Sequence, residues 1–285
     1  MKKIIVMVKQ VPDTANVTGD SMKEDGTVNR AALPAIFNPE DLNALEMALE
    51  IKSLTGAEVT VITMGPPKAV DILKYSLYMG ADKVYLISDR KFAGSDTLAT
   101  SYVLSEAVKY LGKFDLYLAG RQAIDGDTAQ VGPQVAEKLG LNIISYVQNL
   151  VEIRDDMIVV EKDSDVQTEV ISARTPLLVT VTSDANDPRY PNSFNMLKYF
   201  RSDLQTDISD ENKNRYEKNG WVIPVLTFDD LGLDPDKCGL NGSPTKVHKI
   251  KSIVLKGGDL TLFENNEGGV MGLVKEIVKD YSGEN

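Results

Sequence analysis

Short apolar runs alternate with helical patterns through the first half of the chain. Each run is rich in branched side chains and soon interrupted by polar residues, which predicts a buried strand. The runs occupy 3–8, 58–64, 83–88, 114–119 and 142–147, and another follows at 176–181. Strands separated by helices predict an α/β fold with a doubly wound, mostly parallel sheet.

The segments between these runs carry signals for the start and end of helices. In the first segment Asn38 stands at the N-cap, Pro39 takes the first helical position, acidic residues follow, and Gly56 ends the helix. Helical periodicity predicts three further crossover helices, at 66–81, 96–112 and 128–140.

The pattern changes after residue 148. Strand-like segments with polar turns predict an antiparallel excursion before the run at 176–181. A charged excursion at 209–220 and a turn-rich stretch at 227–250 follow, and an apolar stripe predicts a last helix at 270–281. So much irregular chain is typical of a segment that contacts a partner. We therefore expect an α/β domain over 1–183 and, over 184–285, a partner-docking loop with an extended C-terminal arm.

Composition and charge narrow the function. The formal net charge of −11 disfavours nucleic acid and anionic membranes as partners. The chain has no apolar run suited to a signal peptide or a membrane span, so we expect a cytoplasmic protein without membrane insertion. Cys238 and His248 are the single cysteine and histidine, which excludes an internal disulfide and a multi-cysteine metal site. We expect no metal and no catalytic side chain, so any chemistry would belong to a bound cofactor.

Unusual loops follow four of the predicted strands. They read VKQVPDT, TMGPP, SDRKFAGSDTLAT and GRQAIDGDTAQVG, and they combine small residues with hydroxyls and carboxylates. The carboxyl ends of parallel strands meet at one edge of a sheet, where ligands bind. Neither GxGxxG nor GxxxxGK[ST] occurs in the sequence, so the common phosphate-binding motifs do not explain the loops.

The last of these loops, residues 120–132, suits a nucleotide. Gly120, Gly126 and Gly132 would let the backbone approach a ligand closely, with a positive φ at Gly126. Backbone N–H groups and the Thr128 hydroxyl at the predicted helix start could receive a phosphate. The carboxylates at 125 and 127 could accept hydrogen bonds from ribose hydroxyls or an adenine amino group. The alternative is an Asx-type turn followed by an N-cap, which needs the same residue types.

Two other positions are equally open on sequence grounds. Asp96 either caps the following helix or faces a ligand together with Thr97 and Thr100. Met7 and Met64 stand near the mouth of the predicted crevice, although methionine is more often core filler.

Six motifs, in order, resemble the β subunit of the electron transfer flavoproteins. They are VKQVPDT, NPED, ITMGPP, MGADKVYLISDR, DTLATS and GRQAIDGDTAQVGP, and NDPRYP follows where that family carries its PRY segment. The resemblance covers about the first two hundred residues. It implies a heterodimer with an electron transfer flavoprotein α subunit, and an adenine nucleotide held by this chain.

The resemblance also separates two possible nucleotides. The respiratory type of the family holds a structural AMP and usually reads AIDDD in this loop, whereas the bifurcating type holds FAD and resembles AIDGDTAQVGP. Gly126 therefore favours FAD over AMP. Carried over position by position, the resemblance implies that the nucleotide is lined by Met7, Lys9, Asn38, Pro39, Asp41, Met64, Gly120, Arg121, Gln122, Ala123, Ile124, Asp125, Gly126, Asp127, Thr128, Ala129, Gln130 and Val131. Asp96, Thr97 and Thr100 would extend the pocket toward the flavin end.

A mechanism is implied as well. NADH would deliver a hydride to the flavin of this chain, and the two electrons would part toward ferredoxin or flavodoxin and, through the α-subunit FAD, toward a dehydrogenase. After PRY the sequence departs from the family's usual basic run, so a flavin-dependent lactate-type dehydrogenase is a candidate beside an acyl-CoA dehydrogenase. The alternatives are a non-bifurcating subunit with structural AMP and a non-redox nucleotide-binding module.

Overall fold

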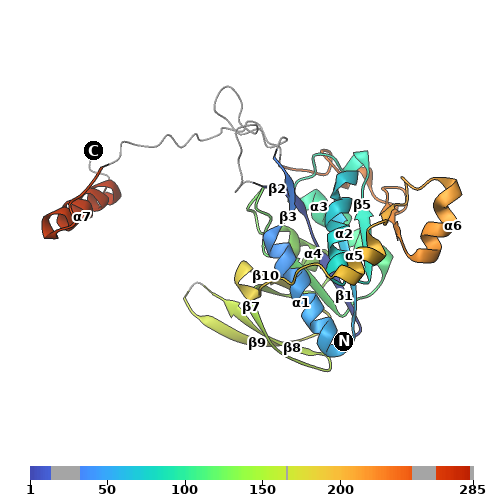
Figure 1. Cartoon of the computed structure of the whole chain (residues 1–285), viewed down its shortest axis with the longest axis horizontal. Helices are drawn as coiled ribbons and strands as arrows, with labels where there is room; N and C mark the ends of the chain where they lie inside the picture. The colour runs from blue at the N-terminus through green and yellow to red at the C-terminus, as the bar shows by residue number, and fades with distance from the viewer. Residues whose placement is uncertain (14–32, 165, 246–260, 283–285) are drawn as a thin grey trace.

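The computed structural model describes residues 1–13, 33–164, 166–245 and 261–282 of the chain (Figure 1). A nine-stranded sheet in the order β13-β5-β4-β1-β6-β10-β7-β8-β9 forms its centre. His248, the single histidine, for which no catalytic role is expected, lies outside the described residues. The strands of this sheet are β1 (Lys3–Met7), β4 (Glu58–Met64), β5 (Lys83–Ile87), β6 (Leu116–Gly120), β7 (Asn142–Arg154), β8 (Met157–Asp163), β9 (Thr168–Arg174), β10 (Leu177–Val181) and β13 (Val225–Leu226).

Strands β13 through β10 and the first part of β7 run parallel, and β7, β8 and β9 continue the sheet antiparallel. The predicted α/β fold with an antiparallel excursion is therefore confirmed. Two small pairs complete the strands, β2 (Gln10–Pro12) with β3 (Ala35–Phe37) and β11 (Asp203–Leu204) with β12 (Val222–Ile223). The helices are α1 (Pro39–Thr55), α2 (Val70–Met79), α3 (Thr97–Leu111), α4 (Val131–Leu139), α5 (Ser193–Tyr199), α6 (Asp210–Asn219) and α7 (Glu267–Ser282), with short 3-10 turns η3 (Pro67–Ala69), η4 (Arg90–Phe92), η5 (Ser183–Ala185) and η6 (Pro235–Lys237).

Both faces of the parallel part are covered, which is why its strands read as continuous apolar runs. Ile4 and Val6 pack with α1 and α2 in one core cluster, whereas Ile5 and Met7 pack with α3 and α4 in another. Alternate residues of one strand thus fill two separate cores. Within the described residues, no helix combines the length and apolarity needed to cross a bilayer.

Helix α1 is buried on its inner and its outer side. Its outer side carries Asn43 and Glu46, and the chain after β10 covers both. The Asn43 amide donates to the Asn186 carbonyl at 2.7 Å, and Arg189 pairs with Glu46 at 2.8 Å. Buried polar groups must be hydrogen-bonded, so these pairs fix the chain at 186–189 against α1.

The structure differs from the sequence-based expectations in three elements. Helix α4 begins at Val131 rather than 128, because the preceding residues adopt irregular backbone with positive φ at Asp127 and Ala129. The helix expected at 66–81 is divided into η3 and α2. The charged excursion contains α6, whose i,i+4 mixture of charges suits an exposed helix.

The turn-rich stretch lies partly on the α/β body. Just before it, strand β13 hydrogen-bonds along β5; within the stretch, Cys238 is buried and the Ser243 hydroxyl accepts from the Asp96 backbone N–H at 2.8 Å. In contrast, α7 stands apart from the sheet in Figure 1. Its apolar side chains are 43% to 58% exposed between Val270 and Val278. The division into 1–183 and 184–285 stays a prediction.

Candidate nucleotide-binding site

The strand order reverses between β1 and β6. From β1 the chain moves outward through β4 to β5, and it then returns to place β6 on the opposite side of β1. In open α/β sheets the ligand crevice lies at this switch point, outside the carboxyl ends of the strands. Three segments meet there: the chain after β1, the first turn of α1, and the loop 121–130 after β6.

Asp41, in the first turn of α1, is hydrogen-bonded to the chain after β1 and to the end of β6. Its Oδ1 accepts from the Gly120 N–H at 2.9 Å, and its Oδ2 accepts from the Lys9 N–H at 2.8 Å. A Cβ at Gly120 would stand 2.5 Å from Asp41 Oδ1 and 2.7 Å from the Asp41 backbone nitrogen. Glycine is therefore needed at 120 because α1 approaches β6 closely. Gly132 is similarly placed against β10, where a Cβ would lie 2.8 Å from Thr180 Cγ2.

The first turn of α1 also holds the loop after β6. Asn38 donates to the Gln122 carbonyl at 2.8 Å and accepts from the Ile124 N–H at 3.1 Å. The prediction that Asn38 is the N-cap residue is confirmed, although its side chain makes no capping bond to the helix. Pro39 at the first helical position has no N–H that needs an acceptor. The Asn38 side-chain amide instead bonds the loop after β6.

Glu40 is a site residue that the sequence reasoning missed. Its buried carboxylate pairs with Arg121 at 2.8 Å and accepts from the Gln122 N–H at 2.8 Å. An acid in the first turn of a helix usually complements the helix dipole at the surface, so the sequence alone signalled only a helix start. The buried position of Glu40 becomes apparent only when β6 is placed beside α1.

The tip of the loop is open. Lys9 Nζ pairs with both oxygens of Asp125 at 2.7 Å, and the Gln122 side chain donates to Asp127 at 3.1 Å. Gly126 is exposed, and a Cβ there would meet nothing within 4 Å. The expected positive φ at Gly126 is wrong, because the left-handed residues are Asp127 (49°) and Ala129 (52°). Aspartate tolerates this region better than most residues, since its short polar side chain bonds locally.

Thr128 is displaced from its expected place at a helix start. Helix α4 begins at Val131, so Thr128 precedes it within the loop. Its side chain is exposed, and no acceptor or donor among the described residues engages its hydroxyl. The hydroxyl is therefore available to a ligand, although without the contribution of a helix dipole.

The start of α3 lies at the same edge of the sheet. Asp96 caps this helix by accepting from the N–H groups of Leu98 and Ala99, each at 3.0 Å, which confirms the capping interpretation. Desolvation raises the pKa of Asp96, but hydrogen bonds from Thr245, Ala99 and Leu98 outweigh it and hold the pKa below its ordinary value. The Thr97 hydroxyl donates to Gln130 Oε1 at 2.8 Å, and so joins α3 to the loop after β6.

The remaining predicted residues are less directly connected. Thr100 lies in the first turn of α3, with its N–H bonded to the Asp96 carbonyl at 2.9 Å. Met7 is 5% exposed and packs in the core beside α3 and α4, as core filler would. Met64 is partly buried at the end of β4. A role of these residues in lining a nucleotide stays a prediction.

Burial raises the pKa of Asp41 from 3.8 to about 7, against the lowering effects of the Gly120 and Lys9 N–H groups, Asn38 and the Lys9 charge. The folded chain therefore binds more protons than the unfolded chain between these pH values, and its stability falls as pH rises through this window. The full effect is on the order of 4 kcal/mol.

Asp41→Asn should remove this contribution and flatten the decrease in unfolding free energy between about pH 4 and pH 7. Urea unfolding of wild type and variant at pH 5 and pH 8 measures the two slopes. The variant also loses one acceptor for the two N–H groups, so it should be less stable than wild type at pH 5. Parallel pH profiles would contradict the assignment.

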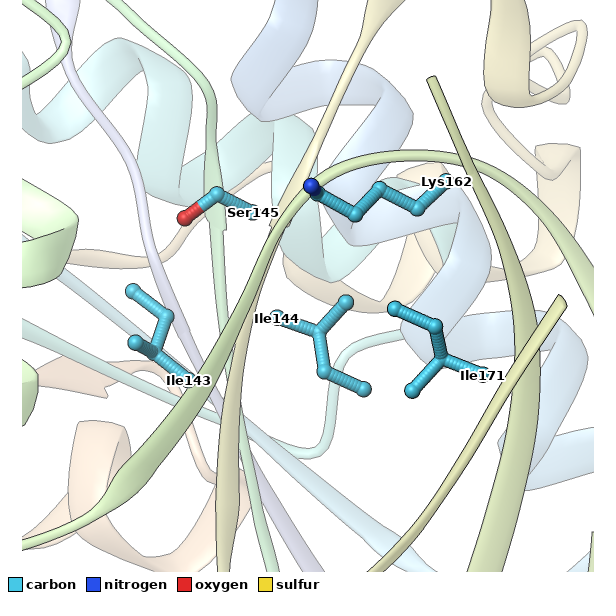
Figure 2. A pocket seen from close by; sticks show the side chains of 5 residues that line it. All are labelled: Ile143, Ile144, Ser145, Lys162 and Ile171. Carbon is cyan, nitrogen blue, oxygen red and sulfur yellow. The ribbon is translucent and has the colours of Figure 1, made fainter. Parts of the chain in front are cut away.

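A separate hollow of about 340 Å³ lies on the β7–β9 part of the sheet. Figure 2 shows its lining, in which Ile143, Ile144 and Ile171 lie near Ser145 and Lys162. None of the predicted nucleotide residues lines this hollow, and Ser145 and Lys162 are its only polar side chains. The switch-point crevice therefore remains the candidate site.

The fold is that of a doubly wound α/β protein, and the candidate site lies at its switch point. Residues 25–201 match the electron transfer flavoprotein domain. The chain is 44% identical over 257 residues, 90% of each chain, to caffeyl-CoA reductase-Etf complex subunit CarD of Acetobacterium woodii. It is 44% identical over 254 residues, 89% of each chain, to the electron transfer flavoprotein subunit beta of Clostridium acetobutylicum.

A third relative is the acryloyl-CoA reductase electron transfer subunit gamma of Anaerotignum propionicum, 38% identical over 98% of this chain and 99% of that one. The chain therefore belongs to the electron transfer flavoprotein family, among its β subunits.

Proposed function

We propose that this chain is the β subunit of a cytoplasmic, heterodimeric electron transfer flavoprotein that binds FAD at the switch-point crevice and bifurcates electrons from NADH. The observation that carries the proposal is the loop 121–130, which α1 holds at its base through Asn38, Glu40 and Asp41 while its tip at Gly126 stays open. Two relatives support a role in electron transfer. One is named as a subunit of a caffeyl-CoA reductase-Etf complex, and the other as an electron transfer subunit of acryloyl-CoA reductase.

The donor and acceptor groups at the crevice fit a nucleotide. Lys9 and the Thr128 hydroxyl would bind phosphate oxygens, and the carboxylates of Asp125 and Asp127 would accept hydrogen bonds from ribose or adenine. Asp41 would keep its two N–H partners and hold the walls of the crevice together. Thr97, bonded to Gln130, would extend the site toward the flavin end.

When bound, the FAD would accept the hydride and supply the splitting of the electron pair toward ferredoxin or flavodoxin and, through the α-subunit FAD, toward a dehydrogenase. The side chains of this chain would bind, orient and shield it. None is required to act as an acid or base, and the only cysteine, Cys238, is buried away from the crevice beside Phe92 and Leu233.

The nucleotide content of the purified heterodimer tests this proposal. We expect acid to release two FAD per heterodimer, and NADH to bleach flavin absorbance without a dehydrogenase. One FAD with one AMP would contradict the proposal and favour the non-bifurcating alternative, in which this chain holds a structural AMP. Saturable ATP binding without any flavin colour would instead favour a non-redox module.

We also propose that α5 carries the docking surface for the dehydrogenase. Phe194, Leu197 and Phe200 stand at helical spacing and are 83%, 72% and 55% exposed. Residues 188–201 contain no acidic residue and three cations, of which Arg189 is paired with Glu46 while Lys198 and Arg201 flank the stripe, in a chain of net charge −11. An exposed apolar stripe beside positive charge suits a partner with an apolar cleft and an acidic rim.

The second proposed contact is with the α subunit, through α7. Its valine, leucine, isoleucine and methionine side chains remain exposed in the described part of the chain, which is typical of a helix that lacks its partner. We propose that α7 belongs to the C-terminal arm that wraps the α subunit.

A further inference from the structure

The docking helix α5 packs on the body through Tyr199, which is partly buried against the main core cluster near the C-terminal end of the helix. None of the residues of α5 is fully buried. A hollow of about 400 Å³ lies beneath it, lined by its residues Asn195, Lys198 and Tyr199 together with residues near the C-terminal ends of α1 and α2. A short helix above a hollow depends on contacts at its two ends.

The N-terminal end of α5 is bound to α2. The Asn192 N–H donates to the Tyr78 carbonyl at 2.9 Å, and the Asn195 side chain donates to the same oxygen at 3.4 Å. Just upstream, Arg189 pairs with the buried carboxylate of Glu46 on α1. This end is therefore held by the α/β body itself.

The C-terminal end is bound by Trp221, the only tryptophan of the chain. Its indole Nε1 donates to the Lys198 carbonyl at 2.5 Å, which satisfies one of the carbonyls that a helix end leaves open. Arg201 and Arg215 lie 5.6 Å and 5.8 Å from the indole ring, and Tyr216 meets it edge-on at 5.7 Å. The contacts therefore surround the indole and restrict its rotation.

Trp221 is in turn fixed to the core. Its carbonyl accepts from the Asp203 N–H at 2.9 Å, at the start of the β11–β12 pair. Leu204 and Ile223 of this pair are each 1% exposed and belong to the main core cluster. A continuous path thus runs from the core through the β11–β12 pair and the indole to the last turn of the docking helix.

We propose that Trp221 is a positioning residue for docking: it holds the C-terminal end of α5 so that the Phe194–Leu197–Phe200 stripe faces a partner dehydrogenase in one orientation. This inference rests on the proposed docking surface. Without the indole N–H, α5 stays attached at Tyr78 but samples other orientations, and each encounter with the dehydrogenase must select the competent one. Loss of this selection raises KM and leaves kcat unchanged.

The test uses the purified heterodimer. Trp221→Phe keeps an aromatic ring for Arg201, Arg215 and Tyr216 but removes the N–H donor. One neutral hydrogen bond corresponds to about a fivefold change, so amide exchange in 193–201 should become about fivefold faster. The KM for the dehydrogenase should rise by a similar factor, with flavin content and kcat unchanged. Trp221→Ala should show larger changes in the same direction. Tyr110→Ala, which removes an exposed aromatic side chain on α3, is the matched control and should change neither quantity.

The outcomes separate this inference from the proposal on which it rests. Unchanged exchange in 193–201 would overturn the positioning role whatever the KM, and a raised KM in that case would mean that Trp221 itself touches the dehydrogenase. Faster exchange with an unchanged KM would overturn the inference by showing that the dehydrogenase does not dock on α5. Faster exchange with a raised KM supports both.

Discussion

Gly120→Ala should release the nucleotide from the purified heterodimer and destabilise the chain by about 2–3 kcal/mol. The new methyl group would stand 2.5 Å from Asp41 Oδ1 and 2.7 Å from backbone atoms of α1, so β6 and α1 would have to separate. That separation breaks the Gly120–Asp41 hydrogen bond and moves the base of the loop 121–130. Nucleotide released by acid, per heterodimer, and the urea midpoint are the two measurements.

Gly126→Ala is the matched control, because it adds the same methyl group to the same loop. Its Cβ meets no atom within 4 Å, and its φ lies outside the left-handed region. We expect a stability change within about 0.5 kcal/mol and normal nucleotide content. If alanine at 126 released the nucleotide and alanine at 120 did not, the loop tip would have to approach the ligand more closely than its base approaches α1.

The double change Phe194→Ala and Leu197→Ala should lower kcat/KM for electron delivery to the dehydrogenase by about 30-fold or more, since central apolar anchors contribute at least about 2 kcal/mol to an interface. Wild type is first assayed with an acyl-CoA dehydrogenase and a lactate-type dehydrogenase, and the variant then with the one it serves. Flavin content should stay normal, because the long-range hydrogen bonds of α5 in the described part of the chain go to Tyr78 and Trp221 and not to the residues of the candidate site.

Val170→Ala is the control for this experiment, because it removes an apolar side chain that is 66% exposed on β9. Strand β9 is one edge of the sheet, whereas α5 packs on α2 near β4 and β5, toward the other edge. It should leave electron delivery unchanged. An undiminished kcat/KM in the double variant would place docking elsewhere on the chain, whereas loss of flavin would mean that α5 supports the crevice.

Periodicity and strand-end composition were sufficient to predict the sheet and the edge at which the candidate site lies. The run at 58–64 became β4 with the same limits, because a strand buried on both faces leaves a continuous apolar signal. Strand β13 has two residues and follows Pro224, so it carries no such signal. It exists because β5 offers it an edge.

The hydrogen bonds and ion pairs of the site could not be predicted in the same way. The partners that Asn38, Glu40 and Asp41 find at Gly120, Gln122 and Ile124 lie 79 to 86 positions away in the sequence. Local rules interpret an asparagine before a proline and two acids as a helix start, and they interpret any loop glycine as backbone freedom. Gly120 and Gly126 are alike on those rules, and only the position of α1 makes one of them indispensable.

The pairing of Glu46 with Arg189 can form only late in the synthesis of the chain. The two residues are 143 positions apart, and β10, which lies between β6 and β7, is made only a few residues before Arg189. When α1 leaves the ribosome, the Glu46 carboxylate therefore has no Arg189 to pair with. The position of β10 beside β6 is also still empty at that stage. About two-thirds of the 285 residues must be translated before either contact can form, which makes the nascent chain dependent on long-range contacts that form late.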